Sequence, residues 1–321
     1  MPCILSKTVV KLLAVIIMRN QLRSSLLLML ATIIWGSAFV SQKIGMDHIG
    51  PFTFQAVRSF MAVIGMLPVI YLLDKKKEDG KTFLTRWNDK KLIMGGLLCG
   101  IPLFLACNLQ QLGLVEADSG KSAFLTAMYI VIVPIIGIFR NRKPSPAIPF
   151  SVALAVFGLY ALTGANGQIT VTDLLLIGCA LMFSLQITFV DIFAPDVDSL
   201  RLNTIQVLVC SVLSTIVMFI TETPTLTGIG QAWVPLAHTG FLSMGAAYSL
   251  QIIGQKDLEP STASLIMSLE SVFALLFGWL VLGDQLTSWE AIGCVSIFVA
   301  VILSQIPVKK KSSVCEVNPK V

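Results

Sequence analysis

The chain has 321 residues, of which 55% are hydrophobic and 13% are charged, and its mean hydropathy is +0.83. Soluble domains carry about a quarter charged residues, so this sequence has too little charge to cover a globular surface. The composition therefore excludes an ordinary soluble enzyme, a disordered protein and a disulfide-rich secreted module. It predicts a membrane protein that crosses the bilayer several times.

The formal net charge of +5 does not indicate nucleic-acid binding. The basic residues lie in short loops beside apolar runs, without a basic helix or interleaved aromatic residues, and membrane topology explains that pattern better. The seven cysteines include no CxxC pair, and neither His48 nor His238 has a plausible metal-binding partner. We therefore expect no disulfide, no metal and no cofactor.

Ten apolar stretches are candidate membrane spans. A bilayer core is about 30 Å thick, so a spanning helix needs roughly 20 mostly apolar residues. In chain order the stretches are residues 24–44, 52–73, 92–112, 119–139, 147–163, 173–193, 202–220, 233–253, 261–282 and 289–306. The sequence thus predicts an all-α membrane protein with ten transmembrane helices.

The distribution of Lys and Arg predicts that both termini are cytoplasmic. In that orientation 20 of the 23 basic residues lie inside, in an N-terminal segment (residues 1–23), in loops and in a basic tail (residues 307–321). Only Lys43 and Lys121 lie outside, and Arg58 falls within a span. Cytoplasmic loops carry such an excess of basic residues, which predicts a multi-pass protein of the cell membrane. Residues 8–18 are apolar but too short to span, so we expect an interfacial stretch or a start near Met18.

The two halves of the chain resemble each other weakly. NLQQLG at 108–113 matches SLQIIG at 249–254, and we call this spacing the first offset. LLL at 26–28 matches LLL at 174–176 at a slightly longer spacing, the second offset. We assign residues 24–164 to a first repeat and residues 172–306 to a second.

Each repeat has five spans, so the second repeat enters the membrane upside down. Inverted repeats are typical of transporters that expose a midplane site to each side in turn. A duplication without transport is the alternative.

Two segments resemble the EamA family of the drug/metabolite transporter superfamily. They are ATIIWGSAFV at 31–40, which is similar to the opening helix of that family, and SLESVFALLFGW at 268–279, which is similar to its ninth helix. The resemblance covers roughly residues 24–306. It implies ten helices in two EamA-type repeats and secondary transport of small metabolites, usually outward.

Three residues within the spans are candidates for the chemistry of transport. Glu270 lies near the middle of the ninth span, where a carboxyl group can exchange a proton or pair with a substrate amine; a structural pair with Arg58 or a hydrogen bond to a neighbouring helix is the alternative. The first offset pairs Tyr129 with Glu270, so the two should face one another. Arg58 lies about a third of the way into its span, and we interpret it as a structural charge whose stem reaches the interface; binding of a substrate carboxylate is the alternative.

Further polar residues at similar depth are predicted to line a substrate cavity with Tyr129 and Glu270. Some of them lie three residues apart, on one face of a helix. About half of such residues are expected to act only as hydrogen bonds between helices. The candidates are Trp35, Ser37, Asn108, Gln111, Gln186, Tyr248 and Gln251.

These observations predict a secondary transporter, an exporter of a small metabolite such as an amino acid or amine, coupled to protons through Glu270. The partners are then a small solute, protons and lipid. No ATP-binding motif or soluble domain is present, so primary pumping is not expected. An intramembrane enzyme is disfavoured because HExxH and GxSxG motifs are absent. A receptor or scaffold without transport is the other alternative.

Overall fold

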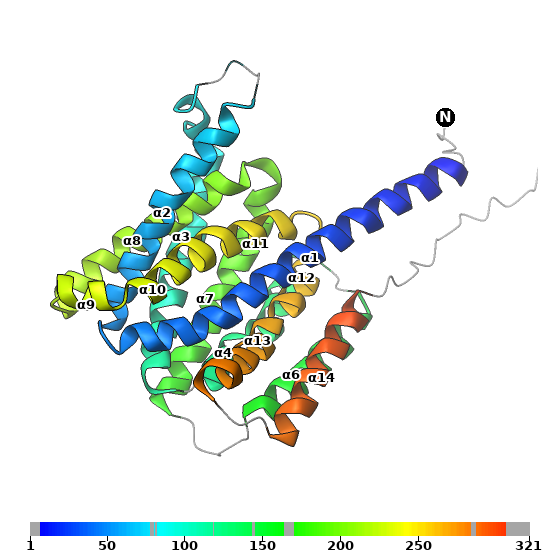
Figure 1. Ribbon diagram of the computed structural model, residues 1–321. Helices are drawn as coiled ribbons and strands as arrows, with labels where there is room; N and C mark the ends of the chain where they lie inside the picture. Colours follow the sequence, from blue (N-terminus) through cyan, green and yellow to red (C-terminus); the bar gives the residue numbers. More distant parts are fainter. Residues whose placement is uncertain are drawn as a thin grey trace, which may run out of the picture.

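The computed structural model describes residues 7–77, 80, 82–117, 119–142, 145–163, 170–283 and 287–305. Within these ranges every regular element is helical, as predicted (Figure 1). Seven helical stretches are long and apolar enough to cross a bilayer. They are Met18–Met46, Pro51–Asp74, Lys90–Glu116, Ser119–Phe139, Val171–Asp196, Ser199–Thr221 and Pro260–Leu282.

Three of the ten predicted spans differ from these seven. Two are shorter apolar helices, α6 (Ala147–Thr163) and α14 (Ser288–Ser304). The third, predicted at 233–253, is divided into α10 (Trp233–Ala237), the π-helical η3 (His238–Ala247) and α11 (Tyr248–Gln255). Hydropathy identifies such a stretch as apolar, but it carries no signal for where its helical geometry changes.

The remaining elements complete the chain. The long helices are α1 (Lys7–Met46), α2 (Pro51–Asp74), α3 (Lys90–Glu116), α7 (Val171–Phe193) and α8 (Ser199–Thr221). The shorter ones are η1 (Thr85–Trp87), α4 (Ser119–Thr126), α5 (Tyr129–Phe139), η2 (Ala194–Asp196), α9 (Leu226–Gln231), α12 (Pro260–Met267), α13 (Leu269–Phe277) and η4 (Gly278–Leu282).

Helix α1 includes most of the predicted N-terminal segment, residues 1–23. It begins at Lys7 and continues into the first span, because no proline or glycine interrupts the sequence before Gly36. Residues 1–6 and the predicted basic tail, 307–321, lie outside the described residues.

Several helices recur at a constant spacing. Helix α12 begins and ends one first offset after α4, and α14 begins and ends one first offset after α6. The starts of α2 and α8 are separated by the second offset. The correspondence between the halves therefore extends from residue identities to helix boundaries.

The packing pairs equivalent helices with one another. Helix α2 packs against α8, and α6 lies beside α14 at one side of the bundle (Figure 1). The contact of α3 with α7 corresponds to the contact of η3 and α11 with α1. The contact of α1 with α13 corresponds in the same way to the contact of α7 with α4 and α5. Exchanging the two halves therefore leaves the pattern of contacts nearly unchanged.

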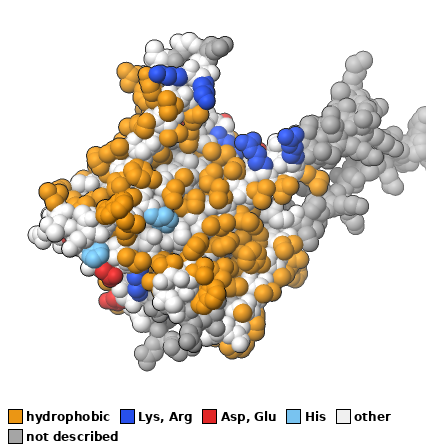
Figure 2. Space-filling view, viewed as in Figure 1, with side chains coloured by type: hydrophobic (Ala, Val, Ile, Leu, Met, Phe, Trp, Pro, Cys, Tyr) orange, Lys and Arg blue, Asp and Glu red, His pale blue; other side chains and the backbone are white. Residues whose placement is uncertain are grey.

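The face of the bundle seen in Figure 2 is largely apolar. Large hydrophobic side chains such as those of Phe150 and Ile220 are exposed, 75% and 76% respectively. Many glutamine, serine and threonine side chains are instead buried. A soluble protein would not expose so much apolar surface, whereas hydrocarbon tails cover it in a membrane.

Ion pairs lie near the ends of the helices. Asp74 at the end of α2 pairs with Arg201 near the start of α8, and both side chains are nearly buried. Elsewhere Asp191 pairs with Arg142 at 2.9 Å and also with Arg140. Charged groups near helix ends avoid the cost of the bilayer centre and hold neighbouring helices together.

Gly36 allows α1 to approach α13 closely. A Cβ atom at this position would overlap the Cβ of Phe273 and would lie 2.7 Å from its carbonyl carbon. Real Cβ atoms do not approach this closely, and the second of these atoms is backbone that cannot rotate away. The contact between the two helices therefore requires a residue without a side chain at position 36.

We expect Gly36→Ala to lower the free energy of unfolding by about 1–3 kcal/mol, because the added methyl group overpacks the contact. The measurement is thermal unfolding of the purified protein in detergent. Gly137→Ala is the matched control, since no atom lies within 4 Å of a Cβ at that position in helix α5. Equal unfolding temperatures for the wild type and Gly36→Ala would contradict the close approach.

Candidate functional site

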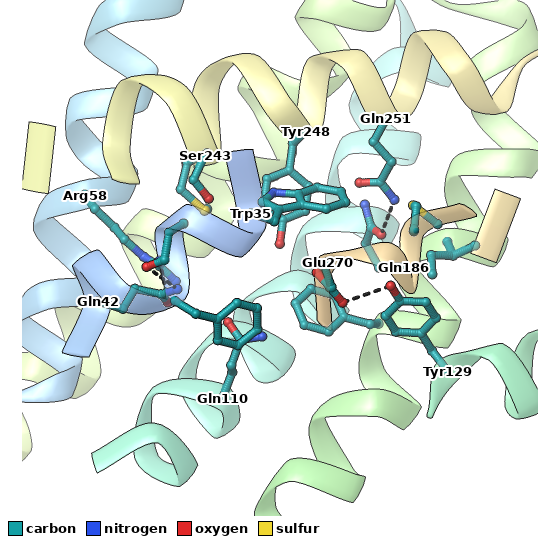
Figure 3. Close-up of a pocket in the computed structure, with 16 residues that line it drawn as sticks. Trp35, Gln42, Arg58, Gln110, Tyr129, Gln186, Ser243, Tyr248, Gln251 and Glu270 are labelled. Atoms are coloured by element: carbon teal, nitrogen blue, oxygen red, sulfur yellow. Dashed lines mark hydrogen bonds between the residues drawn. The ribbon is translucent and has the colours of Figure 1, made fainter. Parts of the chain in front are cut away.

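A small cavity lies inside the bundle, between the two halves of the chain (Figure 3). It contains about 30 Å³ of free volume, which is room for about two water molecules. A solute as large as an amino acid therefore requires the cavity to widen. The lining residues are Trp35, Ala38, Phe39, Gln42, Arg58, Gln110, Tyr129, Phe183, Gln186, Ile187, Ser243, Met244, Tyr248, Gln251, Met267 and Glu270.

Tyr129 and Glu270 meet at one side of the cavity. The hydroxyl group of Tyr129 donates a hydrogen bond of 2.9 Å to a carboxylate oxygen of Glu270 (Figure 3). Both side chains are buried, with exposed fractions of 3% and 6%. The first offset predicts that these two side chains face one another, and the hydrogen bond confirms it.

Both residues follow an interruption in their span. Helix α4 ends at Thr126 and α5 begins at Tyr129, while α12 ends at Met267 and α13 begins at Leu269. A second hydrogen bond joins the interrupted helices, from the hydroxyl group of Ser271 to the carbonyl oxygen of Ala123 at 3.0 Å. The two interruptions thus lie together in the interior, where irregular backbone is tolerated.

Trp35 and Tyr248 form the aromatic part of the cavity wall. Their rings pack edge to face, with centroids 5.0 Å apart, and the Tyr248 hydroxyl group lies 3.8 Å from the sulfur of Cys107. The indole nitrogen of Trp35 is buried and has no hydrogen-bond acceptor among the described residues. A polar solute in the cavity could accept that hydrogen bond.

Neutral amides form a hydrogen-bonded chain along another side. Gln251 donates to Gln186 at 3.1 Å, Gln186 donates to Gln206 at 3.1 Å, and Gln206 donates to Asn203 at 2.9 Å. This chain joins α11, α7 and α8, and it leaves the buried Oε1 of Gln251 without a described donor. That oxygen is a second unsatisfied polar group on the cavity wall.

Arg58 lines the cavity opposite the Tyr129 and Glu270 pair in Figure 3. Its side chain is 2% exposed, so the guanidinium group lies in the interior. The prediction that its stem reaches the interface is therefore wrong. Arg58 donates to the side-chain oxygens of Gln42 and Gln55. It makes no ion pair with Glu270, which is one structural alternative for that carboxyl group; the other, a hydrogen bond to a neighbouring helix, is the bond from Tyr129.

Six of the nine predicted substrate-binding residues line the cavity, and three do not. The hydroxyl group of Ser37 donates a hydrogen bond to the carbonyl oxygen of Ile34 and lies 3.2 Å from Nε2 of His238. Asn108 donates to Ser214 at 2.8 Å, which joins α3 to α8, and Gln111 is fully buried away from the cavity. Asn108 and Gln111 do share a helical face, but that face packs against other helices.

Polar residues absent from the predicted set also line the cavity, namely Gln42, Gln110 and Ser243. The first offset relates Gln110 to Gln251, so the repeat contains the signal for it. Gln42 lies seven residues after Trp35 and therefore on the same helical face. Ser243 lies in the π-helical η3, whose altered periodicity gives no comparable signal.

Comparisons with known proteins agree with one another. The profile of the EamA-like transporter family matches residues 22–164 and again residues 170–305. An uncharacterized transporter of Archaeoglobus fulgidus is 32% identical over 291 residues, covering 88% of this chain and 86% of the relative. The uncharacterized transporter YoaV of Bacillus subtilis is 26% identical over 264 residues, 80% of this chain and 87% of the relative.

A similar fold also occurs among solved structures. One crystal structure, described only as that of a protein, aligns with a TM-score of 0.71 over 88% of this chain and 96% of its own. The two sequences are 16% identical, so this likeness concerns the fold alone.

We expect Tyr129→Phe to destabilise the protein by about 1–3 kcal/mol, because the buried carboxyl group of Glu270 loses its hydrogen-bond donor. Thermal unfolding in detergent measures the effect. Tyr71→Phe is the control, since Tyr71 is 47% exposed and its hydroxyl group makes no hydrogen bond to the described residues. If both variants unfold at the wild-type temperature, the Tyr129 hydroxyl group does not stabilise Glu270.

Proposed function

Because the chain belongs to the EamA-like transporter family and is therefore a membrane transporter, we propose that it exports a small metabolite, such as an amino acid or amine, by alternating access. One observation carries the proposal: two interrupted spans meet at a buried polar cavity, joined by the Tyr129–Glu270 hydrogen bond. Discontinuous helices at the membrane midplane form the substrate sites of many secondary transporters.

We further propose that the chain forms ten transmembrane helices in two inverted repeats, residues 24–164 and 172–306. The seven long spans, α6, α14 and the divided stretch from Trp233 to Gln255 supply the ten crossings. The helix boundaries that recur at the first and second offsets, and the contacts that survive exchange of the halves, support this architecture. Two such halves can rock against each other around a fixed central site.

Polar contacts between the halves occur at both ends of the bundle and suit the role of gates. At one end Lys121 of α4 pairs with Asp173 of α7 at 2.6 Å. At the other end, Arg142 after α5 pairs with Asp191 of α7. Glu259 lies near Arg142, and burial raises the pKa of its carboxyl group. Opening one set of contacts while the other stays closed would expose the cavity to one side at a time.

The same arrangement gives the roles of the cavity residues. Trp35, Gln186, Tyr248 and Gln251 bind the solute through aromatic faces and amide groups, while Glu270 accepts the solute amine or a proton. A carboxyl group that alternates between these two partners couples export to proton entry. A receptor or scaffold would not need a polar cavity of this kind at the centre of the bundle.

Transport is tested by counterflow into proteoliposomes, with mixtures of labelled amino acids and of labelled amines as probes. We expect protein-dependent exchange of at least one mixture, and uptake driven by a pH gradient that Glu270→Gln abolishes without changing thermal stability. Glu116→Gln is the control, because that carboxyl group is exposed at the end of α3 and contacts Thr172. No exchange of either mixture would contradict the proposed transport, and unchanged gradient-driven uptake in Glu270→Gln would contradict its coupling role.

The proposed orientation places both termini in the cytoplasm of a cell-membrane protein. We expect a cysteine at Thr223, an exposed residue after α8, to react with an impermeant thiol reagent in intact cells. A cysteine at Asn88, exposed before α3, should react only after lysis. The background replaces Cys3, Cys294 and Cys315 by serine. The reverse pattern of labelling would invert the topology.

A further inference from the structure

Arg58 is a buried cation that faces the cavity without a carboxylate partner. No Asp or Glu among the described residues lies within ion-pair distance of its guanidinium group, whose side chain is 2% exposed. Arginine stays protonated in proteins, and a charge at membrane depth is costly to bury. An unpaired cation in such a place is therefore a candidate binding group rather than a stabilising one.

Two glutamines hold the guanidinium group in place without neutralising it. Nη1 donates to Oε1 of Gln42 at 2.7 Å, while Nε and Nη2 both donate to Oε1 of Gln55. The amide nitrogen of Gln42 donates to the carbonyl oxygen of Ala38, and that of Gln55 donates to Ser59. These bonds fix which end of each amide faces Arg58. They account for three of its five N–H groups.

The other neighbours of Arg58 are also uncharged in their ordinary forms. The Phe54 ring lies 5.6 Å from the guanidinium carbon, and Cys107, Cys210 and Tyr248 are the titratable side chains that interact with it. Among the described residues around it, no Asp or Glu carboxylate compensates the positive charge.

The second half of the chain has no cation at the equivalent position. The second offset, which separates the starts of α2 and α8, relates Gln55 to Asn203 and Arg58 to Gln206. Gln206 donates to Asn203 at 2.9 Å, so a neutral amide fills the place that Arg58 occupies in the first half. The fold therefore accepts a neutral side chain there, and only the first half contributes a cation to the wall of the shared cavity.

We propose that Arg58 binds the carboxylate group of the transported solute, so that the substrate is a compound with both a carboxylate and an amine. This inference rests on the proposed function. Arg58 and Glu270 are the two charged residues of the described cavity wall, and they supply one charge of each sign. A zwitterion matches both, whereas an amine would leave Arg58 unpaired and a phosphate dianion would bring excess charge beside Glu270.

Binding in detergent tests this assignment without a transport assay. The probes are the standard amino acids, the amine and the carboxylic acid derived from each, chloride and inorganic phosphate; stabilisation against heat gives the affinity. We expect at least one amino acid to bind about tenfold more tightly than its amine. Arg58→Gln should remove that preference, and Arg23→Gln, at an exposed arginine, should keep it.

Arg58→Lys provides a second test if Arg58→Gln does not fold. It keeps the charge but loses the two-pronged geometry, so we expect weaker amino-acid binding and unchanged amine binding. The assignment is overturned if no carboxylate compound binds, if amines bind as tightly as amino acids, if chloride or phosphate binds in their place, or if the Arg58 variants keep the wild-type preference.

The counterflow assay separates this inference from the proposed function. Exchange of compounds without a carboxylate would leave the transporter in place and remove the role of Arg58. Amino-acid binding that depends on Arg58, with no exchange across the membrane, would keep the site and refute transport.

Discussion

A carboxyl group inside a bilayer needs a hydrogen-bond donor, and the donor for Glu270 comes from the other half of the chain. Tyr129 supplies it at 2.9 Å, and the Ser271 hydroxyl group adds a bond to the carbonyl oxygen of Ala123, which also accepts the backbone N–H of Ala127. Lipid offers no alternative donor, so the Tyr129 and Glu270 side chains must remain together or be exposed to water. This requirement holds the two interrupted spans against each other and locates the polar cavity between them.

The near symmetry of the bundle makes its asymmetries informative. Tyr129 and Glu270 occupy equivalent places but differ in acidity, and Arg58 corresponds to the neutral Gln206. A purely structural duplication has no need to place one cation and one carboxyl group on the wall of a shared cavity. Their presence gives the cavity two charged ends, which suits a solute with two charges and a single bound orientation.

Hydropathy and the repeat predict much of this structure, whereas local geometry decides the rest. Apolar runs predict the helical spans, and the first offset predicts that Tyr129 meets Glu270. The sequence does not predict as well which side of a helix faces the cavity. Gln110 faces it, while the neighbouring Gln111 faces other helices. The partners of Arg58 depend on how α1 packs beside α2, which one sequence does not specify. The periodicity of the sequence likewise gives no signal for the π-helical geometry of η3.

The most direct test of the account is the accessibility of Ser243, a buried cavity residue, replaced by cysteine in a background lacking Cys3, Cys294 and Cys315. An impermeant thiol reagent is applied separately to each face of sealed vesicles of known orientation, with the background protein as control. A cavity between two rocking halves predicts labelling from both faces. Labelling from one face only, or from neither, would contradict alternating access.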